Sequence, residues 1–302
     1  MKILIAGATG AVGVPLTRLL CAAGHEVTGI TRAGAGVDIL RGIGAKPVVA
    51  DVFNTESVRD AIRDAKPDVV IDQLTLLPAD PAELIKYMPN DTRLHQIGGK
   101  NLLSAAEEFG VKCYIMQSRG FYLQAAEGEL AAEDAKLCID APGVVGESAR
   151  TFQAYEDEIL ASQALTGVVL RYGFFYGPGT WYHPTGAIAE QARKGESVII
   201  GRGNGVWSFV HLDDAIEATV AALHSECGVY NIVDDNPLPV SEWLPAFSKW
   251  VGAPLPGSIT AEQALRTVGS EALFYNEAIR GASNLRAKEL LDFKPRRLLW
   301  LQ

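Results

Sequence analysis

Hydrophobic residues in the first half of the chain alternate between short continuous runs and longer amphipathic segments. The short runs are rich in β-branched residues and cover residues 2–6, 26–30, 47–50, 68–71 and 112–116. Segments of helical length separate them, chiefly at 12–23, 55–65 and 91–109. Nearly continuous apolar strands between helices are typical of a parallel sheet covered on both faces. The pattern therefore predicts a doubly wound, Rossmann-like α/β domain.

Residues that begin or end helices stand at the expected boundaries. Gly24 follows the first helical segment and Gly110 follows the long one, positions at which glycine commonly ends a helix. Asn54 precedes the segment 55–65, where its side chain can accept a hydrogen bond from the first helical turn. These boundaries support the predicted alternation of strands and helices.

After the β-rich run 168–171, the regular alternation of apolar strands and helical segments ends. A segment rich in glycine and aromatic residues leads into loops, short helices and a mainly helical tail. We expect a small, mainly helical C-terminal substrate lobe, built from residues 174–195 and 236–302. The α/β domain then comprises residues 1–173 and 196–235, and its segment 197–232 returns to the sheet.

Composition and charge narrow the functional classes. The chain has 302 residues, of which 48% are hydrophobic and 21% charged, a balance that can bury a globular core. A net charge of −9 without a long basic run argues against nucleic acid as a partner. No apolar stretch approaches about 18 residues and no signal-peptide pattern opens the chain, so we expect a cytoplasmic protein without a membrane span. The 4 cysteines and 5 histidines show no metal-ligand spacing, and no metal is predicted.

A glycine-rich turn follows the first predicted strand at once, reading Gly7-Ala-Thr9-Gly10-Ala-Val12-Gly13. Glycine lets the backbone turn tightly and approach a pyrophosphate, and the free amides at the start of the next helix attract its charge. The pattern is specific when a strand precedes it and a helix follows it, as here. We therefore predict a dinucleotide-binding domain whose loop contacts come from Gly7, Thr9, Gly10, Val12 and Gly13.

The end of the second predicted strand bears on which dinucleotide binds. NAD-selective sites place an acidic residue there to accept hydrogen bonds from the ribose 2′-hydroxyl. This strand instead ends Gly-Ile-Thr31-Arg32, and a guanidinium can pair with a 2′-phosphate. NADP is therefore the predicted cofactor. The alternative is that Arg32 is only a solvated surface residue.

Several ordered motifs give the chain a resemblance to the short-chain dehydrogenase/reductase superfamily, in particular its extended branch, the NAD-dependent epimerase/dehydratase family. Besides the glycine loop, the matching segments are Ala50-Asp51-Val52, Gly98 to Ala106, Gln117 to Tyr122, Leu170 to Gly179, and Phe209 to Asp214. The resemblance implies that Asp51 and Val52 meet the adenine. It also implies a homodimer with a four-helix seam, which the helices 91–109 and 147–164 could form.

The chain departs from this family at the position of the usual proton donor. Redox members carry Tyr-x-x-x-Lys on the helix before the sixth strand, and the lysine lowers the tyrosine pKa. No such pair occurs in this sequence, and the corresponding positions fall near Ser148 to Arg150 and Phe152 to Ala154. The structural asparagine of the family aligns with His95, or after a gap with Asp91 or Arg93.

The serine of the family is retained as Ser118, four residues before Tyr122. It follows a strand at the edge where open α/β sheets place ligands. The alternative is a hydroxyl that only satisfies a local turn. We take Ser118, Tyr122 and Tyr176 as the catalytic candidates, and Tyr172 and His183 as further groups that could protonate a developing alkoxide.

A second departure concerns the substrate. Sugar-nucleotide epimerases of the family carry Arg-Asp before the Phe-Val-His segment to hold a diphosphate, whereas this chain has Trp207 and Ser208. A neutral indole cannot neutralise phosphate, so a small, largely apolar substrate is expected rather than a nucleotide sugar. Alternatively, Trp207 is simply an aromatic residue at the edge of the core.

Three functions are compatible with these residues. The favoured one is an NADP-dependent oxidoreductase acting on a small, largely apolar carbonyl or alcohol. A second is a non-redox isomerase, dehydratase or cyclase on the same fold. The third is a non-enzymatic sensor that binds NADP and reports it to a partner, a role compatible with loss of the tyrosine-lysine pair.

Overall fold

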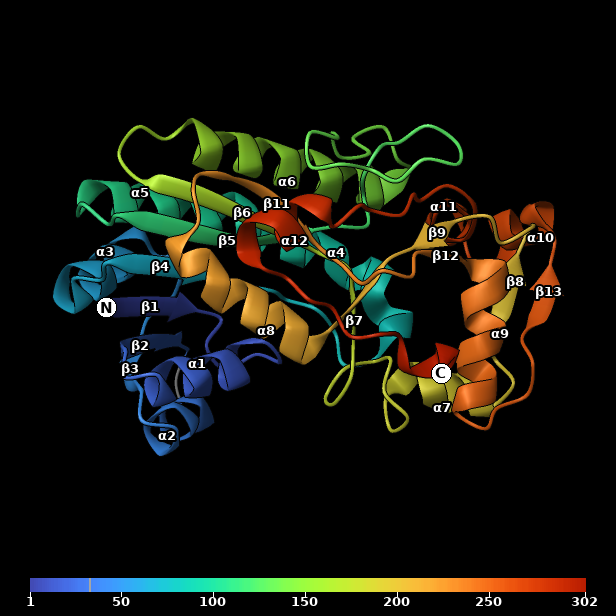
Figure 1. The fold of residues 1–302 in the computed structure, drawn as a ribbon, viewed down its shortest axis with the longest axis horizontal. Helices are drawn as coiled ribbons and strands as arrows, with labels where there is room; N and C mark the ends of the chain where they lie inside the picture. Colours follow the sequence, from blue (N-terminus) through green and yellow to red (C-terminus); the bar gives the residue numbers. More distant parts are fainter. Residues whose placement is uncertain (33) are drawn as a thin grey trace.

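The computed structural model describes residues 1–32 and 34–302, and a seven-stranded parallel sheet forms the middle layer of the part at the left of Figure 1. The strand order is β11-β6-β5-β4-β1-β2-β3, so the chain winds outward in both directions from β1 and β4. The predicted doubly wound α/β fold is confirmed. The strands are β1 (Lys2–Ala6), β2 (Glu26–Thr31), β3 (Lys46–Val49), β4 (Val69–Asp72), β5 (Cys113–Arg119), β6 (Thr166–Tyr172) and β11 (Gly228–Ile232).

Successive residues of a strand point to opposite faces of the sheet, and here the residues on both faces are apolar. Helices therefore cover both faces. In β1, Ile3 and Ile5 pack on one face, against helices α1 (Gly13–Ala22), α2 (Ala35–Gly42), α8 (Leu212–Ala221) and α12 (Leu285–Leu291). Leu4 and Ala6 pack on the other, against α3 (Thr55–Ala65), α5 (Lys100–Glu108) and α6 (Gly143–Ala161). Two apolar layers thus hold the sheet, which explains the continuous apolar strands in the sequence.

The predicted helix boundaries have the expected local chemistry. The Asn54 side chain accepts a hydrogen bond from the Ser57 amide at 3.1 Å and caps α3. Gly24 and Gly110 adopt positive φ after α1 and α5. The long segment predicted at 91–109 is more complex, because α4 (Leu84–Arg93) leads through a π-helical turn (Leu94–Gly99) into α5.

The segments expected to form the C-terminal lobe, residues 174–195 and 236–302, are built from short pieces. Their helices include α7 (Ala187–Arg193), α9 (Val240–Trp250), α10 (Ala261–Thr267) and α11 (Ser270–Glu277). Each of their short strands pairs with a strand of the segment 196–211: β7 (Phe174–Tyr176) with β10 (Phe209–His211), β13 (Gly257–Ile259) with β8 (Val198–Ile200), and β12 (Leu238–Pro239) with β9 (Val206–Trp207). Of the segment 197–232, which we expected to return to the main sheet, only β11 joins it.

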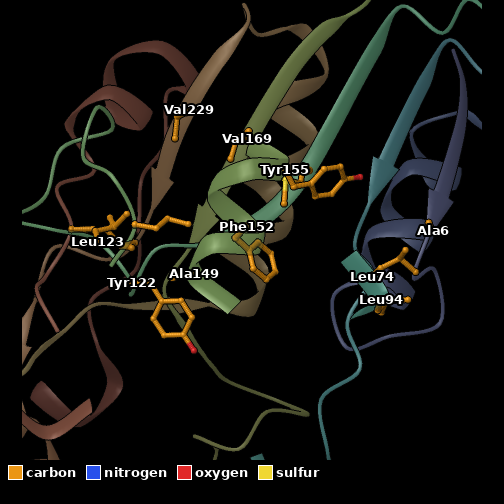
Figure 2. Packing of buried hydrophobic residues seen from close by; sticks show 14 of the residues in the cluster. Ala6, Leu74, Leu94, Tyr122, Leu123, Ala149, Phe152, Tyr155, Val169 and Val229 are labelled. Atoms are coloured by element: carbon orange, nitrogen blue, oxygen red, sulfur yellow. The ribbon is translucent and has the colours of Figure 1, made fainter. Parts of the chain in front are cut away.

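Short 3-10 turns complete the structure at Pro81–Glu83, Ala222–His224 and Leu299–Leu301. Figure 2 shows Ala149, Phe152 and Tyr155 along α6, where they join the larger of the two apolar layers. Among the described residues, no helix is long and apolar enough to cross a membrane.

Candidate functional site

The glycine loop between β1 and α1 is shaped by two very close backbone approaches. Gly7 has a φ of +80°, and a Cβ there would lie 2.3 Å from the carbonyl oxygen of Gln73. A Cβ on Gly13 would lie 2.0 Å from the carbonyl oxygen of Gly7. Both positions therefore require glycine, and the loop is fixed against the segment that follows β4.

The outer side of the same loop is open to a ligand. Gly10 and Thr9 are exposed, and a Cβ on Gly10 would meet only the Gly7 carbonyl, at 3.3 Å. Val12, the N-cap residue of α1, has an apolar side chain that cannot accept hydrogen bonds from the helix amides. The open loop and the uncapped helix start have the features expected of a pyrophosphate site, and the individual contact residues stay a prediction.

Two neighbouring strand ends would flank the adenosine part of such a ligand. Arg32 directly follows β2 and is exposed, while the next residue lies outside the described chain. After β3, the Asp51 carboxylate accepts a hydrogen bond from the Phe53 amide at 3.0 Å. The carbonyl of Val52 accepts one from the Asn101 side chain at 2.8 Å, which ties this turn to α5. The predicted contact residues thus lie along the carboxyl ends of β1, β2 and β3.

Asp72, the last residue of β4, lies in a buried cluster of hydroxyl groups. Its carboxylate accepts hydrogen bonds from Tyr114 at 3.1 Å, Tyr155 at 3.0 Å and the Leu74 amide at 3.0 Å. The two phenol oxygens lie 2.7 Å apart. Burial, followed by the neighbouring Tyr114 and Asp72, raises the pKa of Tyr155 well above its ordinary value. Tyr155 therefore serves to fix the end of β4 and does not supply phenolate at neutral pH.

Ser118 belongs to a second buried network, which connects β5, α6 and β6. Its hydroxyl donates to Glu156 at 2.5 Å, and Glu156 pairs with Arg171 at 2.6 Å. The Arg171 guanidinium also donates to the carbonyl oxygens of Ala135 and Glu133. Sequence reasoning missed Glu156, although a glutamate on the core-facing side of a predicted helix is a signal for a buried partner.

A third cluster surrounds Phe152, which lies near the position where redox members of the family carry the lysine of Tyr-x-x-x-Lys. The Arg119 guanidinium lies 4.7 Å from the centre of the Phe152 ring and pairs with Asp91. Asp91 also accepts a hydrogen bond from the Leu76 amide at 2.7 Å, which ties the segment after β4 to α4. The His95 ring lies 4.4 Å from that of Phe152, and within the described chain neither of its nitrogens has a hydrogen-bond partner.

The three residues that could align with the structural asparagine of the family have different surroundings in the structure. His95 lies in the π-helical turn beneath α6, and burial lowers its pKa against the opposing effects of Asp91 and Asp72. Asp91 is the partner of Arg119, and Arg93 lies over the ring of Phe53 at 5.0 Å. Of the three, His95 is the residue in contact with Phe152.

The tyrosine candidates are buried in different places. The hydroxyl of Tyr122, which follows β5, lies 2.5 Å from that of Tyr275 in α11, and burial raises the pKa of Tyr122. Tyr176 packs edge-on against His211 and Trp300, and its hydroxyl has no hydrogen-bond partner among the residues that the structure describes.

The further proton-donor candidates are also placed apart. Tyr172 contacts Thr219 at 2.6 Å, and burial raises its pKa to about 12. His183 lies in a loop beside Thr185. The structure therefore does not gather the predicted proton donors at one point.

Trp207 is part of an aromatic stack with Phe121, which follows β5, and Phe174, which follows β6. The Phe174 ring stacks on Trp207 at 3.9 Å and on Phe121 at 4.3 Å. The Trp207 indole donates to the carbonyl of Tyr275 at 2.8 Å, and the Ser208 hydroxyl accepts a bond from the Ala282 amide. Both residues are thus used in packing, which matches the alternative interpretation of Trp207.

The parallel sheet and its glycine loop together define a dinucleotide-binding protein of the Rossmann type. The model of the NAD dependent epimerase/dehydratase family matches residues 3–232. The chain belongs to this family.

Relatives and solved structures agree with that assignment. A "3-diazoavenalumate denitrifying reductase" from a Streptomyces species is 38% identical over 99% of this chain and 98% of its own length. A "2-alkyl-3-oxoalkanoate reductase" from Stenotrophomonas maltophilia is 26% identical over 84% of this chain and 77% of its own. The UDP-glucose 4-epimerase of Thermus thermophilus in complex with NAD superimposes with a TM-score of 0.75, at 25% identity, over 99% and 96% of the two chains. A nicotinamide dinucleotide cofactor and a reductase-like enzyme are therefore supported.

Proposed function

We propose that this protein is an NADP-dependent reductase that acts on a small, largely apolar substrate. The observation that carries the proposal is the 38% identity to a reductase over nearly the whole of both chains. The open glycine loop supports it as a place for the phosphates of the cofactor, and the neutral Trp207 at the position where nucleotide-sugar enzymes of the family carry a charged residue supports a largely apolar substrate. The diazo compound in the relative's name gives the first substrate class to test.

In this proposal, different residues of the chain bind different parts of the cofactor. The loop from Gly7 to Gly13 holds the pyrophosphate, Arg32 pairs with the 2′-phosphate, and Asp51 and Val52 border the adenine. The ion pair of Asp91 with Arg119 holds the segment after β4 in place. When bound, NADPH supplies a hydride, and the protein orients it toward the substrate.

The proposal extends to a cytoplasmic location. Cys21, Cys113, Cys138 and Cys227 are all unpaired in the described chain, which suits a reducing compartment.

The preference for NADP is tested by an Arg32→Ala variant. We expect its affinity for NADP to fall roughly 10-fold to 100-fold, because one charge-assisted contact is lost, while its affinity for NAD stays within about twofold. Isothermal titration calorimetry with both dinucleotides measures this. Arg41→Ala, which removes an exposed cation from α2, is the matched control. Equal losses for the two cofactors in Arg32→Ala would refute the assignment of Arg32.

The reductase activity is tested by NADPH oxidation against a panel of small aromatic diazo compounds, ketones and aldehydes. Consumption of NADPH with a matching yield of reduced product supports the proposal. Binding of NADPH without oxidation in the presence of any member of the panel would favour the sensor.

A further inference from the structure

A dinucleotide held at the glycine loop has to extend over the sheet in both directions. The loop follows β1, which lies between β4 and β2 in the sheet. The predicted contacts of the 2′-phosphate and the adenine are Arg32, Asp51 and Val52, which follow β2 and β3. The nicotinamide half must therefore pass over the ends of β4 and β5, since dinucleotides cross the sheet where the strand order reverses. The ribose of that half carries two hydroxyls, which need polar partners when they leave water.

Several polar side chains at these strand ends are already engaged or lie too deep. The hydroxyls of Ser118 and Tyr155 each donate to a buried carboxylate. The His95 ring and the Tyr176 hydroxyl have no hydrogen-bond partner in the described chain, but both residues are at most 1% exposed. A ligand that lies on the edge of the sheet would not contact either of them unless the surrounding side chains moved.

Arg119, the last residue of β5, has donors that a ligand can use. Its side chain is 12% exposed, and a guanidinium carries five N–H groups. Within the described residues this guanidinium donates one hydrogen bond, from Nη2 to Asp91, and its Nε has no partner. The partly exposed guanidinium can therefore donate to a ligand at the edge of the sheet.

Two contacts hold this guanidinium in place. Its central carbon lies 4.7 Å from the centre of the Phe152 ring, which is within the range of a cation–π contact. Asp91 is about 2% exposed and accepts a hydrogen bond from the Leu76 amide at 2.7 Å, so the carboxylate is fixed behind the arginine. Because the ion pair is neutral as a whole, it suits the uncharged hydroxyls of a ribose better than a phosphate.

The place of Arg119 also bears on the lysine that the sequence lacks. Phe152 lies in α6 near the position where redox members of the family carry this lysine, and a phenyl ring brings no charge. The Arg119 guanidinium lies against the same ring, but it comes from β5. A cation is thus present beside this part of α6, although α6 does not provide it.

We propose that Arg119 binds the ribose in the nicotinamide half of NADP through its guanidinium, and so supplies from β5 the cation that α6 lacks. This inference rests on the proposed NADP-dependent function. Hydrogen bonds from Arg119 to the ribose hydroxyls fix the ribose and limit the movement of the ring attached to it. Asp91 is a positioning residue that acts through Arg119.

The test uses three ligands that share the 2′-phosphorylated adenosine. The ligand 2′,5′-ADP lacks the second ribose, 2′-phospho-ADP-ribose contains it without nicotinamide, and NADP is complete. The variant is Arg119→Gln with Asp91→Asn, which leaves no uncompensated charge in the interior and places a shorter amide where the guanidinium was. We expect NADP and 2′-phospho-ADP-ribose to bind roughly 10-fold more weakly, because a charge-assisted contact is lost, and 2′,5′-ADP to bind within about twofold of the wild type. Isothermal titration calorimetry measures all three, and no substrate is required.

A rescue experiment examines the relation to α6. Phe152→Lys is added to Arg119→Gln with Asp91 retained, so that a lysine of α6 can pair with Asp91 and face the ribose. We expect this protein to bind NADP and 2′-phospho-ADP-ribose within about threefold of the wild type. Phe152→Leu in the same background brings no cation and should not restore binding. Equal affinities of the lysine and leucine proteins would overturn the claim that Arg119 replaces a cation of α6.

The fragment series gives each failure its own pattern. Equal losses for all three ligands in Arg119→Gln with Asp91→Asn would show that the ion pair supports the whole site, and unchanged NADP binding would show that Arg119 does not contact the cofactor. A loss for NADP but not for 2′-phospho-ADP-ribose would assign the contact to the nicotinamide ring. Each of these results overturns the inference and leaves the proposed function standing. If the wild-type protein binds none of the three ligands, the proposed function falls and the inference falls with it.

Discussion

A Glu156→Ala variant should lose about 3–5 kcal/mol of unfolding free energy, one of the largest effects expected of any single substitution in this chain. Glu156 is about 1% exposed and is the anionic partner of Arg171, which is about 2% exposed. Removing it leaves a guanidinium in the core with carbonyl partners only, and it also removes the acceptor of the Ser118 hydroxyl. Urea unfolding followed by circular dichroism measures the loss.

Two further variants show whether the loss of stability comes from breaking the buried ion pair or from any substitution in α6. Glu158→Ala removes a glutamate of the same helix whose ion pair with Lys100 is about half exposed, and it should cost less than about 1 kcal/mol. Replacing both partners, as Glu156→Leu with Arg171→Met, should recover part of the loss, because no uncompensated charge is then buried. A Glu156→Ala variant as stable as Glu158→Ala would contradict the buried network.

The strands and the glycine loop could be predicted from the sequence because their signals are local. The apolar run at 2–6 and the three glycines that follow it can be recognised within a dozen residues, although the backbone that Gly7 approaches belongs to Gln73, far along the chain. The boundary at Asn54 is of the same kind, since the cap and its partner Ser57 are three residues apart. These features were therefore predicted within a residue or two.

The charged clusters could not be predicted, because their members meet only after the sheet has formed. Asp72 and Tyr155 are 83 residues apart, and Asp91 and Arg119 are 28 apart. Nothing in the local pattern around Asp72 distinguishes a buried carboxylate from one that simply ends a strand. The π-helical turn that holds His95 was not predicted either, since the segment 91–109 was interpreted as one continuous helix.

Trp207 had two interpretations from the sequence: a sign of an apolar substrate, or an aromatic residue at the edge of the core. In the sequence, a neutral indole stands where related enzymes carry a charged residue, and from this we expected no contact with a diphosphate at this position. Its stacking with Phe174 and its bond to the Tyr275 carbonyl depend on three segments far apart in the chain. The lobe's aromatic stack is thus a product of tertiary packing, while the expected apolar character of the substrate followed from residue type alone.

A Gly10→Val variant should bind NADP at least about 100-fold more weakly and yet remain folded. Gly10 is exposed, and the contact that a Cβ would make is with the Gly7 carbonyl at 3.3 Å, so the fold can accept the side chain with a small local shift. The same side chain would occupy the outer face of the loop, where the backbone must approach a pyrophosphate. The loss of binding should therefore be far larger than the loss of stability, and thermal unfolding with and without NADP compares the two.

Two other glycines supply the contrast. Gly13→Val should destabilise the fold itself, since its Cβ would lie 2.0 Å from the Gly7 carbonyl in the interior of the loop. Gly42→Val, at a position with open space around it, should leave both stability and NADP binding close to those of the wild type. A Gly10→Val protein whose melting temperature still rises with NADP as much as that of the wild type would show that the dinucleotide does not bind against this loop. A Gly10→Val protein that unfolds as readily as Gly13→Val would instead show that the outer face of the loop is packed, contrary to the exposure of Gly10.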